Sequence, residues 1–260
     1  MPTLLLRFRD KSRACKRTTL GFSLVEIAVV LVIISVLLTI VAVPLATQIE
    51  QKRVEETQKM IEGAKDALYG FASANGRLPC PATDIVNIGT TNSAGIENPS
   101  GGGVCAVQVG LLPAVTLGIT PVDASGFMQD GWSDGAASRR IRYAVSITNT
   151  SALTTTDGVK TATMSTIATA KHLYVCATGL VAAPPTANCG ATVVTLTDQA
   201  PAVIFSFGKN SGANSFDETN NQNADKIFTS GNANATFDDI VTWLSLNTMF
   251  SRMVQAGKLP

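Results

Sequence analysis

The feature that most constrains this chain is an apolar stretch near its N-terminus. Between Glu26 and Glu50 the sequence contains no charged residue, and most side chains are Val, Leu, Ile or Ala. At about 1.5 Å per residue, a helix of this length crosses a hydrocarbon layer of roughly 30 Å. Residues 22–45 therefore predict a transmembrane helix. A charged carboxylate such as Glu26, just inside the start of this helix, is energetically unfavourable in the membrane, which indicates a functional role.

The segment before the apolar stretch is basic. Residues 1–20 contain one acid, Asp10, and six basic residues: Arg7, Arg9, Lys11, Arg13, Lys16 and Arg17. Such a flank holds the N-terminus in the cytoplasm and sends the following part across the membrane. An ordinary secretory signal has a cleavage site after its apolar core. Here the helical pattern continues after the core, so we expect the core to be retained and the cut to precede it, at Gly21.

The residues around this expected cut match a known pattern. Gly21-Phe22-Ser-Leu-Val-Glu26, followed by an apolar run, resembles the signal of type IV prepilins and type II secretion pseudopilins. The resemblance implies that a prepilin peptidase cuts between Gly21 and Phe22 and then methylates Phe22. Residues 1–21 would be a leader peptide that is removed. The alternative is a plain signal anchor in which the glycine and the glutamate occur by chance.

Glu26 has a candidate partner once the leader is gone. In a staggered bundle of such helices, the new Phe22 amine of a neighbouring subunit would pair with this carboxylate and set the stagger. The helix N-terminus also favours a negative charge. The alternative is a carboxylate that snorkels to the membrane surface. Pro44 removes a hydrogen bond to the Ile40 carbonyl and predicts a helix kink.

Beyond the apolar stretch, the sequence predicts a helix and then strands. Over residues 46–74, apolar side chains recur every three or four positions and form one face, and Asn75-Gly76 gives a stop signal. Alternating or β-rich segments predict four strands, over residues 141–147, 173–175, 192–197 and 202–207. They suit an antiparallel sheet that packs on the helix. An Asn- and Asp-rich loop is expected over residues 209–225.

The last predicted element is a C-terminal helix. Thr236, with Asp239 three residues later, has the spacing of a capping box, and Gly257 is the expected stop. The apolar residues assigned to this helix are Ile240, Val241, Leu244, Phe250, Met253 and Val254. The elements together predict an α+β fold with a long N-terminal helix, an antiparallel β-sheet and a C-terminal helix. The resemblance implies a type IV pilin-like fold whose head is residues 46–260.

The cysteines divide at the apolar stretch. Cys15 precedes it and would leave with the leader, while four cysteines follow it: Cys80, Cys105, Cys176 and Cys189. An even set in an exported domain predicts disulfides. Of the three pairings, local closure favours Cys80–Cys105 and Cys176–Cys189. Four buried thiols are the alternative, and zinc is disfavoured because the sequence has no CxxC spacing and one histidine, His172.

The sequence contains no constellation typical of catalysis. His172 has no accompanying Gly-x-Ser-x-Gly elbow, and no phosphate-binding glycine loop is present. Basic residues form no patch outside the leader, so nucleic acid is not indicated. Asp217, Glu218 and Asp225 are weak calcium candidates, with Asn221 and Asn223 nearby, although their spacing is not that of an EF-hand. A solvated turn is the alternative. We expect no enzyme activity and no other cofactor.

These inferences combine into one expected function. The chain resembles a structural subunit, a minor pilin or pseudopilin, of a type IV pilus or type II secretion filament. The resemblance implies three kinds of partner: the prepilin peptidase, other pilin subunits bound through the N-terminal helix, and an inner-membrane assembly platform. It places the chain in the bacterial inner membrane as a single-pass protein with a periplasmic head. The alternative is a membrane-tethered binding or adhesion module that does not polymerise.

Overall fold

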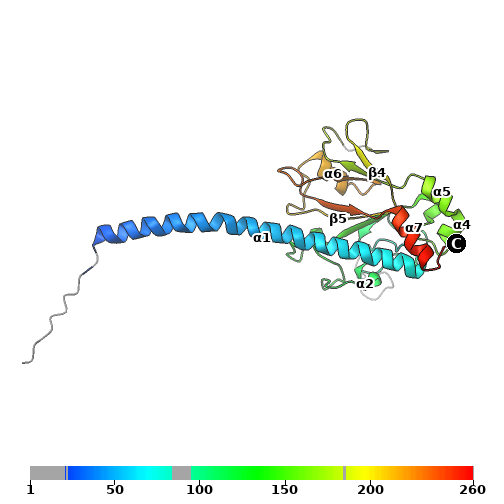
Figure 1. The fold of residues 1–260 in the computed structure, drawn as a ribbon, viewed down its shortest axis with the longest axis horizontal. Coiled ribbons are helices and arrows are strands. Elements are labelled where there is room, and N and C mark those ends of the chain that lie inside the picture. Colours follow the sequence, from blue (N-terminus) through cyan, green and yellow to red (C-terminus); the bar gives the residue numbers. More distant parts are fainter. Residues whose placement is uncertain (1–20, 22, 84–94, 184–185, 260) are drawn as a thin grey trace, which may run out of the picture. The chain divides into compact units, whose positions relative to one another are not determined.

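The chain forms one long helix and a mixed α+β head (Figure 1). The computed structural model describes residue 21 and residues 23–83, 95–183 and 186–259, without the side chains of residues 39–46. Two compact units are present, residues 1–48 and residues 49–260. Helix α1 (Leu24–Asn75) contributes to both. The predicted α+β class is confirmed.

Helix α1 ends where the sequence predicts. Its last residue is Asn75, and Gly76 follows with φ of +71°, a left-handed conformation that glycine adopts without steric cost. The Gly76 N–H donates to the Ala72 carbonyl at 2.8 Å and so satisfies one carbonyl of the last turn. This stop fixes where the chain leaves the helix and enters the β-rich part of the head.

The first sheet of the head is antiparallel. Its strand order is β1 (Val109–Leu111), β2 (Arg142–Val145), β5 (Ala202–Ser206) and β7 (Ile240–Trp243). A second sheet has the order β4 (Thr195–Ala200), β3 (Leu173–Ala177) and β6 (Ile227–Ser230). In that sheet β3 pairs antiparallel with β4 and parallel with β6. The predicted antiparallel sheet is therefore present, and a mixed sheet accompanies it.

Strand β5 lies at the centre of the head and is buried along its whole length. Ala202 and Ile204 face a core cluster that includes Ile61 and Leu68 of α1. Val203 and Phe205, on the opposite face of the strand, pack in a second cluster with the residues of β3 and β6. Successive side chains point to opposite faces of a strand. The first sheet, which contains β5, is therefore the middle layer, with helices on one side and the second sheet on the other.

Short helices complete the head. They are α2 (Ala114–Leu117), the 3-10 helix η1 (Ala137–Arg139), α3 (Thr148–Ser151), α4 (Gly158–Ala162), α5 (Met164–Thr169), α6 (Phe216–Gln222) and α7 (Leu246–Gln255). Helix α7 buries Leu246, Met249, Phe250 and Met253, the spacing of one helical face, in the cluster shared with α1. The Tyr69 hydroxyl of α1 accepts the Ser245 N–H at 2.7 Å and anchors its start.

The predicted start of the C-terminal helix is wrong. Residues Ile240–Trp243 form strand β7, which pairs with β5, and α7 begins at Leu246. Ser245, not Thr236, is the N-cap, and its side chain accepts the Thr248 N–H at 3.4 Å. Thr236 instead donates to Asn234 in a turn. The β-branched and aromatic residues of 240–243 favour a strand, and pairing with a buried strand outweighs the apparent capping box.

Two further predictions need correction. The loop expected over residues 209–225 contains helix α6, whose N-cap Ser215 accepts the Glu218 N–H at 3.2 Å. The strand expected over residues 192–197 is displaced and runs from Thr195 to Ala200. Strands β1 and β6 were not predicted, because three or four residues are too few for a clear alternating pattern.

Phe205→Ala should destabilise the head severely. The Phe205 ring is fully buried between the sheets, and its centroid lies 5.2 Å from that of Phe228. Loss of this ring should lower the free energy of unfolding by about 3–5 kcal/mol. Urea unfolding of the full chain in detergent measures the change. Phe216→Ala, at a ring that is 44% exposed, is the matched control and should cost about 1 kcal/mol or less; equal costs would contradict the layered core.

Candidate functional site

The beginning of α1 is the first candidate site. The helix starts at Leu24, and the backbone N–H groups of Glu26 and Ile27 donate to the Ser23 carbonyl at 3.0 and 3.2 Å. Glu26 therefore lies in the first turn, where the partial positive charge of the helix N-terminus favours a carboxylate. Gly21 is exposed, and Phe22 and residues 1–20 lie outside the described residues.

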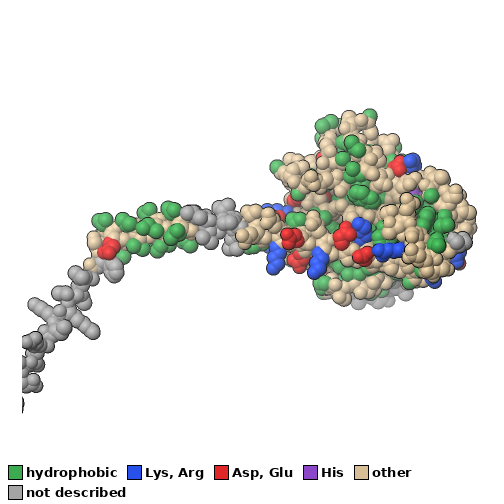
Figure 2. Space-filling model, in the orientation of Figure 1, with side chains coloured by type: hydrophobic (Ala, Val, Ile, Leu, Met, Phe, Trp, Pro, Cys, Tyr) green, Lys and Arg blue, Asp and Glu red, His purple; other side chains and the backbone are tan. Residues whose placement is uncertain are grey.

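Every large apolar side chain from Leu24 to Leu38 is 46–86% exposed. Figure 2 shows this segment as an apolar surface with an acidic side chain at its beginning. Glu26 is the acid in the first turn of the helix. A helix that is apolar on all sides needs an apolar environment, which lipid or other helices can provide. Within the described part of the chain, no helix has the length and hydropathy of a membrane span. The predicted span over 22–45 includes residues outside that description and stays a prediction.

Residues 16–42 match the family model of the prokaryotic N-terminal methylation motif. This motif is the hallmark of prepilin-type precursors, the type IV pilins and pseudopilins. The chain carries a prepilin-type N-terminus. The matched range contains Gly21, Phe22 and Glu26, the three residues on which the resemblance in the sequence rests. No curated protein and no solved structure matches the chain.

The matched range includes the predicted processing residues, Gly21 and Phe22, but not the predicted kink residue, Pro44. Cleavage after Gly21 and methylation of Phe22 are what such a motif implies for a prepilin peptidase, and for this chain they stay predictions. Pro44 lies beyond the matched range, and its side chain is outside the described residues. The backbone is helical at position 44, and the predicted kink stays a prediction.

The head contains two disulfides. Cys80 is bonded to Cys105 and Cys176 to Cys189. They close segments of 25 and 13 residues, and these are the pairs that short loops favour. The first disulfide ties the start of the head to the segment before β1. The second joins strand β3 to the loop that leads to β4.

His172 is a structural residue of the core. It is 2% exposed and lies immediately before β3. Its Nδ1 is 2.8 Å from the Ser146 hydroxyl, and its Nε2 is 2.9 Å from the Ile167 carbonyl. Burial lowers the pKa of this imidazole below its ordinary value, although the bond to Ile167 opposes the shift. Both ring nitrogens are therefore used to hold the segments around Ser146 and α5 against β3.

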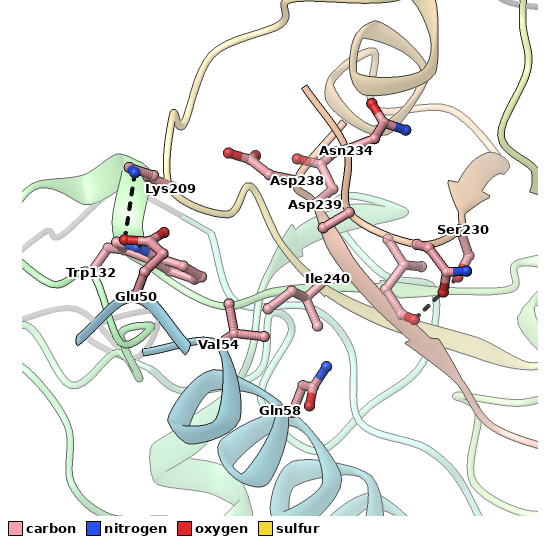
Figure 3. A pocket seen from close by; sticks show the side chains of 14 residues that line it. Glu50, Val54, Gln58, Trp132, Lys209, Ser230, Asn234, Asp238, Asp239 and Ile240 are labelled. Carbon is pink, nitrogen blue, oxygen red and sulfur yellow. Dashed lines mark hydrogen bonds and ion pairs between the residues drawn. The ribbon is translucent and has the colours of Figure 1, made fainter. Parts of the chain in front are cut away.

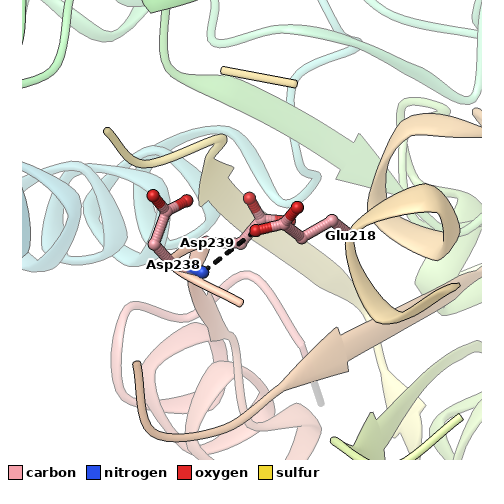
Figure 4. Close-up of side chains that lie close together, drawn as sticks. All are labelled: Glu218, Asp238 and Asp239. Atoms are coloured by element: carbon pink, nitrogen blue, oxygen red, sulfur yellow. Dashed lines mark hydrogen bonds between the residues drawn. The ribbon is translucent and has the colours of Figure 1, made fainter. Parts of the chain in front are cut away.

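The calcium candidates do not come together in the structure. Asp217 accepts the N–H groups of Gly179 and Leu180, at 2.9 and 3.1 Å, in the loop after β3. Asp225 accepts the Ile227 N–H at 2.7 Å. Of the three candidates, only Glu218 joins an acidic group, and its companions there are Asp238 and Asp239 (Figure 4).

Asp238 and Asp239 were not predicted as site residues, because the sequence pattern of this segment predicts a helix. Asp239 is 4% exposed, and burial raises the pKa of its carboxyl to about 8, although Asn221 donates to it. Burial also raises the pKa of Asp238, despite the N–H of Asn210. Spacing along the chain could not have revealed this group, since Glu218 is 20 residues from Asp238.

A cleft of about 420 Å³ opens beside these acids. Its walls are the first turns of α1 within the head, Trp132, Lys209 and the segment from Ser230 to Val241 (Figure 3). The Glu50 carboxylate accepts the Trp132 indole N–H at 3.0 Å and lies 3.5 Å from the Lys209 ammonium. Asp238 and Asp239 line the same cleft, which therefore joins the acidic group to solvent.

His172→Gln should change how stability depends on pH. The native imidazole has a lowered pKa, so below about pH 6.5 the unfolded chain binds a proton that the folded chain resists. This effect removes up to about 1.4 kcal/mol of the wild-type unfolding free energy per pH unit, until the pH reaches the folded-state pKa.

The variant lacks this titration, so its deficit relative to the wild type should shrink between pH 7 and pH 5. Urea unfolding of both proteins at several pH values in that range measures the difference. A deficit that is independent of pH would contradict a buried, neutral His172.

Proposed function

We propose that this chain is a structural subunit, a minor pilin or pseudopilin, of a type IV pilus or type II secretion filament. In this proposal prepilin peptidase removes residues 1–21, and the subunit polymerises through its N-terminal helix. The observation that carries the proposal is the methylation motif at residues 16–42, at the start of a helix with an exposed apolar surface.

The apolar surface of α1 supports polymerisation. Side chains are exposed all along Leu24–Leu38, so lipid can surround this segment before assembly and neighbouring helices can surround it afterwards. Contacts between different faces of identical or related helices generate a filament when they do not close into a ring. An inner-membrane platform would then move subunits from the membrane into the growing filament.

Glu26 is the residue that we propose sets the position of each subunit. It is the acid within the first turn of an otherwise apolar segment. Cleavage after Gly21 would create an amine at Phe22, and the amine of a neighbouring subunit is a cation that this carboxylate can pair with. Pairing in an apolar surrounding compensates two charges that are each costly alone, and a helix that slips along its neighbour loses this pair.

The head supports an exported location and a specialised role. Two disulfides are typical of a compartment that is oxidising, as the periplasm is. With two sheets and several short helices, the head is more elaborate than a bulk filament subunit needs. We therefore favour a minor subunit with a periplasmic or surface-exposed head, anchored by one pass through the inner membrane.

A second candidate function is a membrane-tethered binding module that does not polymerise. The cleft of the head favours it, because its charged and aromatic lining (Glu50, Trp132, Lys209) is typical of a binding surface. The two functions differ in what they require of the N-terminal helix. A tethered module needs an anchor only, whereas a filament subunit needs the acid at position 26.

Glu26→Ala should abolish incorporation into filaments and leave the protein in the membrane. Filaments sheared from cells that express the variant, and probed for this chain, measure incorporation; the membrane fraction shows whether the protein is still made. Glu55→Ala, at an exposed acid of the same helix within the head, is the matched control and should be incorporated normally. Normal incorporation of the Glu26→Ala variant would contradict the proposed role and favour the tethered module.

A further inference from the structure

Three acidic side chains from two segments of the head converge. Glu218 comes from α6, and Asp238 and Asp239 come from the segment before β7. One carboxylate oxygen of each lies within 4.8 Å of the other two. Figure 4 shows the carboxyl groups of Glu218 and Asp239 close together. Glu218 is fully buried and Asp239 is 4% exposed, so two of the three carboxyl groups are removed from water.

The hydrogen bonds of this group leave two oxygens without a donor. Glu218 is satisfied: Oε1 accepts from Asn210 Nδ2 at 3.1 Å and from the Asp238 N–H at 3.2 Å, and Oε2 accepts the Asn214 N–H at 2.5 Å. Asp239 Oδ2 accepts from Asn221 Nδ2 at 2.7 Å. Asp239 Oδ1 and Asp238 Oδ1, however, are buried and have no hydrogen-bond partner. Buried carboxylate oxygens normally have a donor or a metal ion.

No basic side chain that the structure describes balances the acidic group either. Among the described residues, none of the three carboxylates forms an ion pair, and the neighbours that act on Asp239 through charge are Glu218 and Asp238, both acidic. The Lys209 ammonium at the cleft lies 3.5 Å from Glu50 instead. Like charges this close, in a buried setting, are strongly unfavourable unless a proton or a cation neutralises them.

We propose that Glu218, Asp238 and Asp239 bind one calcium ion. Calcium takes oxygen ligands at about 2.3–2.6 Å, so oxygens on one ion lie within about 5 Å of each other, as these three do. Water from the cleft, which Asp238 and Asp239 line, would fill the remaining positions. Magnesium needs ligands at about 2.0–2.1 Å in strict octahedral geometry and gives up its water reluctantly, so it should bind more weakly.

The ion would join segments that are distant in sequence. Glu218 fixes α6, and the Asp238–Asp239 pair immediately precedes β7, the strand that pairs with β5 in the first sheet. The Asn210 side chain and N–H bind Glu218 and Asp238, so the segment before α6 is held as well. Calcium should therefore stabilise the head as a whole. This inference is independent of whether the chain polymerises.

The test compares thermal unfolding of the full-length protein in detergent with and without metal. After EDTA treatment and removal of the chelator, calcium at about 5 mM, well above the affinity range of extracellular sites, should raise the Tm by about 3 °C or more. Magnesium at the same concentration should give a smaller shift. Terbium, whose luminescence Trp132 in the cleft can sensitise, gives a direct reading of binding that calcium should reverse.

The variant Asp239→Asn distinguishes a loss of calcium binding from a loss of folding. The variant removes a carboxyl whose burial is unfavourable, so without metal it should unfold at the wild-type temperature or higher. Its calcium shift and its terbium signal should nevertheless be lost. Asp225→Asn is the matched control, because Asp225 is an acid of the same region that lies outside the group, and it should keep both. No calcium shift in the wild type, a full shift in Asp239→Asn, or a lost shift in Asp225→Asn would overturn the proposal.

Discussion

The apolar surface of α1 has no apolar partner in the part of the chain that the structure describes. From Leu24 to Leu38 every large side chain remains substantially exposed, although burial of each would contribute about 1.5–3 kcal/mol. A segment of this kind is stable only where lipid or other helices surround it. The methylation motif at residues 16–42 overlaps this segment, and in the proposed function lipid surrounds it before assembly and neighbouring helices surround it afterwards.

The head is stabilised in a different way. Strand β5 is buried on both faces, so the helices pack on one side of the first sheet and the second sheet packs on the other. Two disulfides restrain its loops. The acidic group at Glu218 and Asp239 is the exception, since it places two carboxyl groups in the interior next to each other without a basic partner among the described residues. We attribute that exception to a bound ion.

The features that could be predicted from the sequence depend on neighbouring residues. Gly21, Phe22 and Glu26 form a motif within six positions, and the two disulfides join cysteines that are close along the chain. The strand around Tyr143 follows from alternation over several residues. In these cases a local pattern and the fold agree, and the predicted α+β class follows from them.

The features that could not be predicted depend on long-range packing. Thr236 and Asp239 have the spacing of a helix cap, but β5 offers an unpaired edge, and Ile240–Trp243 pairs with it as β7. Strand β6 pairs in parallel with β3, which precedes it by about fifty residues. The acidic group has the same origin, because α6 and the start of β7 bring Glu218 to Asp238 and Asp239. No spacing in the sequence encodes these contacts.

The central claim, that residues 21 and 22 are a processing site, can be tested on the protein itself. Intact mass and N-terminal sequencing of the chain, purified from cells that contain a prepilin peptidase, give the result directly. The account predicts a mature protein that begins at Phe22 and carries one methyl group on its N-terminal amine. A chain that begins at Met1, or one that is cut beyond Leu45, would contradict it.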